Sequence, residues 1–321
     1  MSSARHSKRA AGWSSQRDIL DQRLAPATLT NYRREFKQFL VYLEEQGVDL
    51  EGPPLGWEDM DDFMSNLIED AYNTKRFSYS KLNTMYWSIC YFCPLAASRR
   101  LLPRSFALLK AWHASKPLAL RIPCPWFVVL NVARVAAEWG LWREAIAFVT
   151  LGHSWLRVGN VLSLLKEDVL HSLQKVNPKF PYMLLHLRKT KTAVERAVSV
   201  TRADVAKLLV SVMWHTRPRK KIFPFSYHHI SALFRRILAS LGLQQFNWTI
   251  HCVRAGGATE ARLLGWSMEA IKERALWESS KSADHYIRMS LGLNVFHLLS
   301  KEIISWGNFF DKNVCSIFDD F

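Results

Sequence analysis

The segment 251–264, with the sequence HCVRAGGATEARLL, combines an imidazole and a guanidinium with two adjacent glycines. His251 and Arg254 are spaced to share one face if the segment is helical. Thr249 can cap the N-terminus of this helix and Gly265 can close its C-terminus, which puts His251 in the first turn. Backbone N–H groups and the helix dipole favour an anion at that end. The segment therefore suits the binding of an anion such as a phosphate.

Gly256 and Gly257 should weaken the interior of this helix, so something must compensate for them. Without side chains they keep one turn thin, which would let a phosphodiester backbone approach closely. Tight packing of the helix against another part of the protein is the alternative explanation. Considered alone, a histidine and an arginine on a helix are also more often surface residues than a site.

Four residues outside this segment extend the candidate site. Arg157 lies among apolar residues in LRVGNVLSL, and an arginine in such company needs an anion or a carboxylate partner. Lys191 occupies the tip of a predicted hairpin. Trp277 and Tyr286 follow in ALWESSKSADHYIR, where a serine can cap a short helix that carries the tyrosine. Taken singly, each of the four has an ordinary structural explanation as an ion pair, a solvated turn residue or a core aromatic residue.

The composition favours a polyanionic partner. The 321 residues include 43 Lys and Arg against 28 Asp and Glu, which gives a net charge of +15 and a pI near 9.7. Such a charge favours nucleic acid before an anionic membrane. The chain is long enough for two hydrophobic cores, and no apolar run approaches the length of a membrane span. No membrane partner is therefore expected.

No cofactor or metal site is predicted. The cysteines form no disulfide framework, and the C-x-x-C of Cys90 and Cys93 has neither a second pair nor nearby histidines for zinc. The sequence also has no Walker loop and no carboxylate cluster for Mg²⁺. Reduced, mostly buried thiols indicate an intracellular protein, which we expect in the nucleus of a eukaryote and otherwise in the cytoplasm or nucleoid.

Four segments of the N-terminal part have helical periodicity and together predict a compact bundle. In TLTNYRREFKQFLVYLEEQG the apolar residues recur at helical spacing, and a glycine supplies the stop. A basic flexible tail, 1–17, precedes the predicted domain 18–116. The four segments are 28–47, 57–72, 79–93 and 103–116.

The stretch HASKPLALRIPCP is rich in proline and has little periodicity, which marks a domain boundary with a linker at 117–125. Helical patterns resume at 126–139 and 142–152. Residues 182–200 alternate with period two on both sides of the short link Thr-Lys-Thr, which predicts a β-hairpin. The second domain, 126–321, is therefore predicted to be mainly α with a small β-sheet.

Near the C-terminus, NVFHLLSKEIISWGNFF (294–310) places six apolar residues close to one helical face. A stripe this apolar must be buried, either on its own domain or in a groove of a neighbouring protomer. Periodicity alone leaves these two alternatives open. The six residues are Val295, Leu298, Leu299, Ile303, Trp306 and Phe310.

Taken in order, the candidate residues resemble the catalytic set of the tyrosine recombinase family, the phage-integrase-like, Cre-like enzymes. The family pattern is an arginine after a helix, a lysine in a β-hairpin, His-x-x-Arg on a helix, a histidine or tryptophan, and then a nucleophilic tyrosine. The intervals from Arg254 to Trp277 and on to Tyr286 are also similar to those of Cre-like members, and segment 28–47 resembles the start of the family's core-binding domain. The matching residues are Arg157, Lys191, His251, Arg254, Trp277 and Tyr286.

The resemblance implies a helical core-binding domain that clamps double-stranded DNA, and a catalytic domain that cuts and rejoins it through a 3′-phosphotyrosyl intermediate. Tyr286 would be the nucleophile, and Lys191 would protonate the leaving 5′ oxygen. The two arginines suit a phosphate because each guanidinium can donate two hydrogen bonds and stays charged. Free tyrosine has a pKa of about 10, so His251 would help to remove the proton. Trp277 can only donate an indole N–H to a phosphate oxygen.

Two positions depart from the family pattern. The family usually has an acidic residue at the position of Asn160, and it has a histidine more often than a tryptophan at the position of Trp277. Lys189 and Lys191 are both candidates for the catalytic lysine, and Arg196, which resembles the hairpin arginine of the family, favours Lys191. The residues predicted to contact DNA outside the catalytic set are Arg33, Arg34, Lys37 and Lys189.

Three functions are compatible with this resemblance. The first is a site-specific recombinase, for example the integrase of a mobile element, that works as a homotetramer on DNA. The second is a DNA-binding derivative that no longer cuts, which Asn160 favours. The third is a type IB topoisomerase, although the N-terminal bundle resembles a recombinase clamp more than a topoisomerase cap. Because family members commonly pass a C-terminal helix to the next protomer, we expect the stripe at 294–310 to be buried in trans, with Trp306 as an anchor.

Overall fold

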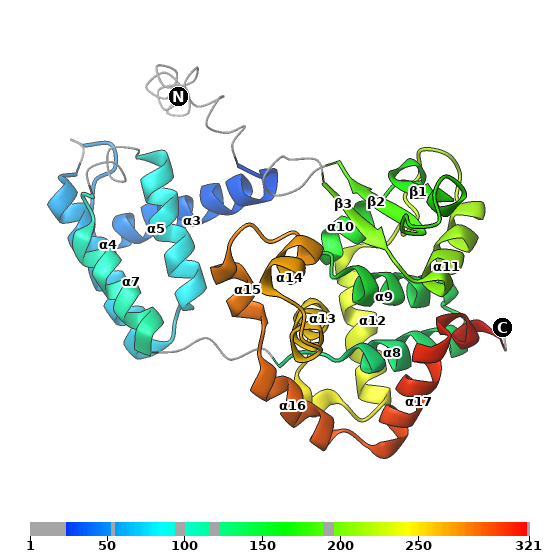
Figure 1. Ribbon diagram of the computed structural model, residues 1–321. Helices are drawn as coiled ribbons and strands as arrows, with labels where there is room; N and C mark the ends of the chain where they lie inside the picture. Colours follow the sequence, from blue (N-terminus) through cyan, green and yellow to red (C-terminus); the bar gives the residue numbers. More distant parts are fainter. Residues whose placement is uncertain (1–23, 53–54, 94–99, 116–121, 189–195, 320–321) are drawn as a thin grey trace. The chain divides into compact units, whose positions relative to one another are not determined.

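The chain divides by its internal contacts into two compact units, Met1–Ala119 and Leu120–Phe321, here called the N-terminal and the C-terminal unit. Figure 1 shows the helices and strands of each unit. None of the described helices is both long and apolar enough to cross a membrane. The computed structural model describes residues 24–52, 55–93, 100–115, 122–188 and 196–319.

The described part of the N-terminal unit is a bundle of helices around one core. Phe39 and Leu82 lie at the centre of this core and are fully buried. The buried carboxylate of Asp61 caps the N-terminus of the last helix of the bundle, because it accepts hydrogen bonds from the backbone N–H groups of Arg104 (2.9 Å) and Ser105 (2.9 Å). The four predicted helices are confirmed, with differences only at their ends. They are α3 (Pro26–Glu45), α4 (Trp57–Thr74), α5 (Tyr79–Phe92) and α7 (Pro103–Ser115).

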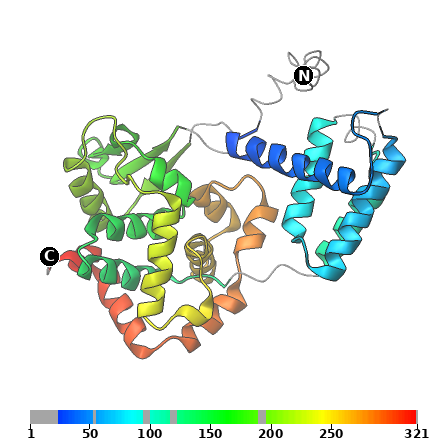
Figure 2. The same cartoon turned by 180° about the vertical axis from the view of Figure 1, so that it is seen from behind.

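The C-terminal unit is mainly helical and is built around α8 and α9, both of which are buried along most of their length. α13 packs on both of them and also contacts α14, α15 and α16 (Figure 1). α12 covers α8 on the side seen in Figure 2. The α-helices are α8 (Trp126–Glu138), α9 (Trp142–Ser154), α10 (Val158–Ser163), α11 (Ala203–Trp214), α12 (Tyr227–Ser240), α13 (Cys252–Leu263), α14 (Met268–Ala275), α15 (Ser280–Tyr286), α16 (Met289–Leu298) and α17 (Lys301–Lys312). Short 3₁₀ turns are η2 (Lys166–Asp168), η3 (Leu173–Lys175), η4 (Gln244–Phe246) and η5 (Val314–Phe318).

A three-stranded antiparallel sheet in the order β1-β2-β3 completes this unit. Its strands are β1 (Val169–His171), β2 (Met183–Leu187) and β3 (Arg196–Val200). Leu185 pairs with Val198, and the alternate residues on this face are buried, which is the period-two pattern of a half-buried strand. The predicted hairpin strands are confirmed, and so is the mainly α fold with a small sheet. β1 was not predicted, because a strand this short carries too few residues for a periodic signal.

The C-terminal stripe differs from the single helix predicted over 294–310. It is split between α16 and α17, because the hydroxyl of Ser300 accepts from the N–H of Ile303 (3.2 Å) and starts a new helix there. Val295, Leu299, Ile303 and Phe310 are buried in the core of the same unit.

The packing of this region is therefore in cis, contrary to the expected exchange between protomers. Asn131 of α8 donates to the carbonyl of Ile303 (2.9 Å), and a Cβ placed on Gly307 would lie 2.2 Å from Cβ of Phe127. Trp306 of α17, the expected anchor of a trans contact, is partly exposed. The close fit to α8 explains why four of the six stripe residues are buried within one chain, whereas Leu298, like Trp306, is exposed.

The two glycines of α13 are explained by tight packing, and the interpretation that they admit a phosphodiester backbone is wrong. Both are buried within the unit. A Cβ on Gly256 would lie 1.7 Å from the carbonyl oxygen of Cys124, and one on Gly257 would lie 2.0 Å from Nε1 of Trp155. The helix begins at Cys252, later than expected, and the predicted stop at Gly265 is confirmed by its φ of +85°.

Replacing Gly256 by alanine is expected to lower the free energy of unfolding by about 3 kcal/mol or more, because a methyl group at this position meets a main-chain carbonyl that cannot rotate away. Denaturant titration of the purified protein measures this. Gly159→Ala in α10 is the matched control: no described atom lies within 4 Å of its added Cβ, so stability should stay the same or rise by up to ~1 kcal/mol. Equal stability of the two variants would contradict the tight packing of α13.

Candidate active site

Arg254 lies at the centre of the candidate site, on the buried side of α13. Its side chain is 4% exposed, and Nη2 donates to the carbonyl oxygen of Ala275 at the end of α14. The guanidinium carbon lies 5.1 Å from the ring centre of Trp277 and 5.9 Å from that of Tyr286. These two rings stack on each other with centres 5.0 Å apart and an angle of 19° between their planes. Three residues of the predicted set are thus in direct contact.

The elements after α13 bring the tryptophan and the tyrosine back to it. α14 ends at Ala275. The next residue, Leu276, has a left-handed backbone (φ 54°) that reverses the chain, and Trp277 then donates its N–H to the carbonyl of Lys272 (2.9 Å). α15 carries Tyr286 in its last turn. Thr259 of α13 holds the following segment, because its hydroxyl accepts from the N–H of Arg288 (3.2 Å). Small residues between these helices let the aromatic rings lie close to α13: Ala258, Ala261, Ala275 and Ala283.

The electrostatics of the site favour an anion. The pKa of Arg254 is lowered to about 10, first by burial and then by the positive charge of Arg157, while the Tyr286 hydroxyl opposes this change. Arg157 is exposed and stands immediately before α10. The two guanidinium groups that repel each other therefore come from different elements, α13 and the residue before α10. In the described part of the chain, Nε of Arg254 is buried without an acceptor. A buried cation that repels a second one and keeps an unsatisfied donor is suited to a phosphate oxygen.

His251 occupies the residue immediately before α13, one turn ahead of Arg254. It is half-buried, and its ring centre lies 5.9 Å from that of Tyr227, the first residue of α12. The contact of His251 with Tyr227 was not predicted from the sequence, since no spacing rule links two residues from different helices. The structure therefore places the imidazole between the start of α13 and the start of α12.

Two of the predicted residues, Lys189 and Lys191, lie outside the described residues. The strand that follows them is held to the site, because Arg196 at the start of β3 donates to Glu278 (2.8 Å) and to the carbonyl of Leu276 (3.4 Å). These contacts join the sheet to the residues on both sides of Trp277. The assignment of the catalytic lysine stays a prediction.

No family model and no curated protein matches this sequence. Solved structures do match. The lambda integrase tetramer bound to a Holliday junction has a TM-score of 0.58 at 16% identity, over 87% of this chain and 77% of that one. The Tn1549 transposon integrase in complex with transposon right end DNA has a TM-score of 0.58 at 12% identity, over 85% and 93%. The XerH recombinase bound to palindromic difH substrate in a post-cleavage complex has 0.52 at 11%, over 79% and 75%.

The chain has the tyrosine recombinase fold. At these identities the likeness concerns the fold, and the roles of single residues depend on the geometry of this chain. Within the described residues no group of three or more His, Cys, Asp or Glu side chains could hold a metal ion.

Asn160, the departure from the recombinase pattern, lies in the first turn of α10. Its backbone N–H donates to the carbonyl of Arg157 (2.9 Å). Its amide side chain carries no charge, so it cannot offset the charge of Arg157 as a carboxylate would.

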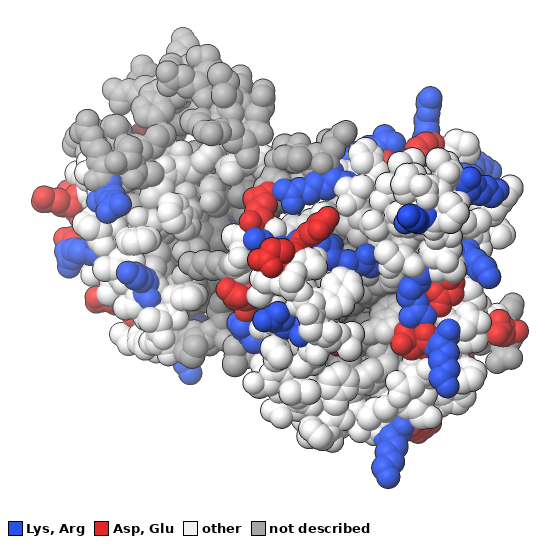
Figure 3. All heavy atoms as spheres, viewed as in Figure 1, with Lys and Arg blue, Asp and Glu red and all other residues white. Residues whose placement is uncertain are grey.

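The residues predicted to contact DNA in the N-terminal part of this fold lie on α3. Arg33, Arg34 and Lys37 are all exposed. Arg34 forms an ion pair with the buried carboxylate of Glu35 (2.7 Å), so its charge is partly offset. Figure 3 shows lysine and arginine side chains spread over the visible face, with acidic side chains beside some of them. DNA contact by the three α3 residues stays a prediction.

Proposed function

We propose that this chain is a DNA-binding tyrosine recombinase that cuts and rejoins double-stranded DNA through a 3′-phosphotyrosyl intermediate. The observation that carries the proposal is the contact of Arg254 with both Trp277 and Tyr286, beside the second guanidinium of Arg157. Together with His251, these residues stand in the order that the family pattern requires. The fold, shared with recombinases bound to DNA, supports the same class of function.

In the proposed reaction the hydroxyl oxygen of Tyr286 attacks the scissile phosphorus. An O–P bond to the tyrosine forms as the bond to the 5′ oxygen breaks. His251 accepts the tyrosine proton, and Lys191 donates a proton to the leaving oxygen. The charge of the five-coordinate transition state is stabilised by Arg157 and Arg254.

Rejoining reverses these steps, with a 5′ hydroxyl of another duplex as the nucleophile. The phosphotyrosyl bond conserves the energy of the broken ester, so the cycle consumes no ATP. Arg254 remains charged throughout, because a pKa of about 10 lies well above neutral pH. Trp277 contributes its indole N–H and the flat surface on which Tyr286 stacks.

Assembly on DNA is part of the proposal. The net charge of +15 favours a polyanionic partner, and one of the similar structures is an integrase tetramer on a Holliday junction. We propose a homotetramer that forms on two duplexes, and an intracellular location where the DNA target is found. The integrase of a mobile element is the origin that we favour, since a transposon integrase is among the similar structures.

The second candidate is a DNA-binding derivative without cleavage activity. It is favoured by Asn160, which leaves Arg157 without the acidic neighbour that is usual in the family. This candidate binds the same DNA, but it forms no covalent bond to it.

Mapping of covalent protein–DNA adducts on genomic DNA tests the proposal and reports the target site together. The purified full chain is incubated with genomic DNA in EDTA and without ATP, denatured, and the DNA attached to protein is sequenced. We expect adducts that resist denaturation and recur at a small set of sites, each with protein on a 3′ phosphate. Sequence-selective binding without adducts would establish the second candidate, and adducts that require a divalent metal would contradict the proposed chemistry.

A further inference from the structure

A basic loop in the C-terminal unit connects α11 to α12 (Figure 1). It carries four cationic side chains within five residues, 217–221, and all four are exposed. None of them forms an ion pair or a side-chain hydrogen bond with another described residue. The four loop cations are Arg217, Arg219, Lys220 and Lys221.

The main chain holds this loop in place. The carbonyl of Lys220 accepts from the N–H of Lys166 (3.0 Å), and the N–H of Ile222 donates to the carbonyl of Leu164 (3.0 Å). Nζ of Lys166 donates to the carbonyl of Thr216 at the start of the loop (2.8 Å). The side chain of Ile222 is fully buried and anchors the other end. The loop cations are therefore displayed on an ordered backbone, which lowers the entropy lost when a partner binds.

Two carboxylates contact the residues around the loop, and they leave it positively charged. Glu167 is exposed and accepts from the backbone N–H of Arg219. Asp168 is buried and is paired with Arg188 of β2's end. Four loop cations therefore share one exposed carboxylate, and the loop keeps a net positive charge.

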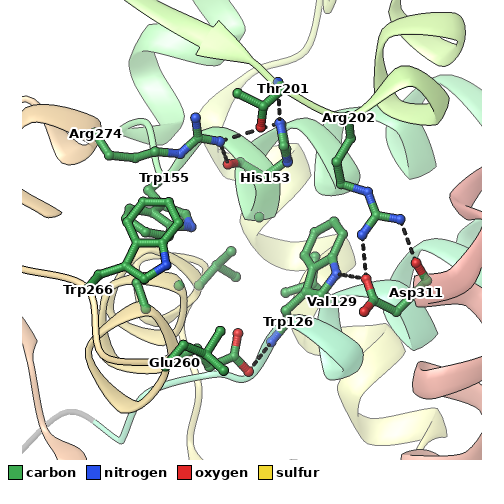
Figure 4. Close-up of a pocket in the computed structure, with 15 residues that line it drawn as sticks. Trp126, Val129, His153, Trp155, Thr201, Arg202, Glu260, Trp266, Arg274 and Asp311 are labelled. Atoms are coloured by element: carbon green, nitrogen blue, oxygen red, sulfur yellow. Dashed lines mark hydrogen bonds and ion pairs between the residues drawn. The ribbon is translucent and has the colours of Figure 1, made fainter. Parts of the chain in front are cut away.

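The arginines of the hollow drawn in Figure 4 differ from the loop cations. Arg202 is paired with Asp311 (2.6 Å), and Arg274 donates to the carbonyls of Ser199 (2.9 Å) and His153 (2.6 Å). Their donors are engaged inside the chain, which gives them a structural role. The donors of the four loop cations have no acceptor among the described residues, so they remain available to the carboxylates of a partner.

Two tryptophans lie beside the loop. Trp214, the last residue of α11, is 80% exposed, and no ring contact links it to another described residue. Trp142, the first residue of α9, is 38% exposed, and its ring centre lies 5.6 Å from that of His215. Arg143 donates to the carbonyl of His215 (3.2 Å), which joins α9 to the start of the loop. Exposed tryptophan next to cations is typical of the centre of a protein–protein interface.

α9 separates these tryptophans from the candidate active site. Its first residue is Trp142, and its C-terminal end leads to Arg157. The 13 residues of this helix span about 20 Å. Indole rings can stack on the bases of a single strand, but a duplex keeps its bases closed. A protein segment, in contrast, can cover an indole ring with apolar side chains.

We propose that the basic tryptophan surface, formed by Trp142, Trp214 and the four loop cations, docks an acidic segment of a partner protein. Carboxylates of this segment pair with the loop cations, and its apolar side chains cover the two indole rings. Charge complementarity requires the acidic residues, and the exposed rings require the apolar ones. The proposal is independent of the proposed strand cleavage, because it uses different residues and requires no reaction.

The probe is a fluorescent peptide of three Asp-Asp-Leu-Phe repeats, and its binding to the full chain is measured by fluorescence anisotropy at one fixed salt concentration. One comparison peptide has asparagine in place of each aspartate and lacks the charge. The other has serine in place of each leucine and phenylalanine and lacks the apolar side chains. We expect saturable binding of the probe below ~1 mM, and a Kd at least about tenfold weaker for each comparison peptide. No binding of the probe, or a comparison peptide that binds as tightly, would overturn the proposal.

Trp214→Ala tests the aromatic part of the surface. It should weaken binding of the probe by about tenfold, and the exposed position of this side chain leaves the fold intact. Trp306→Ala is the matched control, because Trp306 is another partly exposed tryptophan (40%) of the same unit and lies on α17. Unchanged binding in Trp214→Ala, or an equal loss in both variants, would overturn the proposal.

Lys220→Gln combined with Lys221→Gln tests the charge, since the main-chain bonds of the loop remain. Binding of the probe should again weaken by about tenfold. The control, Lys301→Gln with Lys312→Gln, removes the same charge from exposed positions of α17 and should leave the Kd within about twofold. A gel shift with a random-sequence duplex tests DNA as the alternative occupant, and sedimentation tests a second copy. Greater loss of DNA affinity in the loop variant than in the control, or a dimer that Trp214→Ala dissociates, would overturn the proposal.

Discussion

Tyr286→Phe is expected to abolish the covalent protein–DNA adduct while DNA affinity stays nearly unchanged. Phenylalanine keeps the ring that stacks on Trp277 and faces Arg254, but it lacks the oxygen that attacks phosphorus. Adduct formation should fall by at least ~10³-fold, as expected when a nucleophile is removed. The adduct is measured on denaturing gels with the genomic sites found by mapping, and affinity by gel shift at one fixed salt concentration.

Tyr182→Phe is the matched control, since it removes a hydroxyl from a half-buried tyrosine that packs against the core. It should form the adduct at the wild-type rate. An adduct of normal yield in Tyr286→Phe would show that another residue is the nucleophile. Loss of DNA affinity together with the adduct would instead show that Tyr286 has a structural role.

Arg254→Lys is expected to slow cleavage by about 10²- to 10³-fold, with a much smaller effect on DNA affinity. Arg254 uses one end of its guanidinium to contact the carbonyl of Ala275 and keeps Nε without an acceptor among the described residues. An ammonium group cannot make both contacts from one position, so the phosphate in the transition state loses a donor. Single-turnover adduct formation at saturating protein gives the rate, and a titration gives the affinity.

Lysine variants of two further arginines serve as comparisons for Arg254→Lys. Arg157→Lys should show the same separation of rate from affinity, because its guanidinium acts on the same site. Arg262→Lys is the control on the same helix: this arginine is exposed and donates to the carbonyl of Trp266 (2.9 Å) near the end of α13. Its cleavage rate should stay within a few-fold of wild type. Equal losses of rate, affinity and stability in Arg254→Lys would make that residue structural.

Much of the helical architecture was predictable because it depends on local patterns. α3 and α5 follow from apolar residues at helical spacing, and the hairpin strands follow from alternation with period two. Residues close in the chain decide such patterns, so a single sequence is sufficient to find them. β1 has too few residues to produce one.

The candidate site was predictable for a different reason. The order Arg157, His251, Arg254, Trp277, Tyr286 could be recognised as a set, although each residue alone had an ordinary explanation. That the last three lie in contact could not be derived from their spacing. It depends on the left-handed turn after α14 and on the small residues beneath the rings, which act only once α13, α14 and α15 pack together.

By itself the sequence determined the helices, the hairpin strands, the basic charge and the ordered set of candidate residues, since all of these are local or additive properties of the chain. Tertiary structure alone decided that the glycines of α13 face Cys124 and Trp155, that the C-terminal stripe packs in cis on α8, and that Arg254 contacts Trp277 and Tyr286. Each of these outcomes joins segments far apart in the sequence. Their free energy comes from the fit between surfaces, and periodicity along one segment carries no information about the surface that it meets.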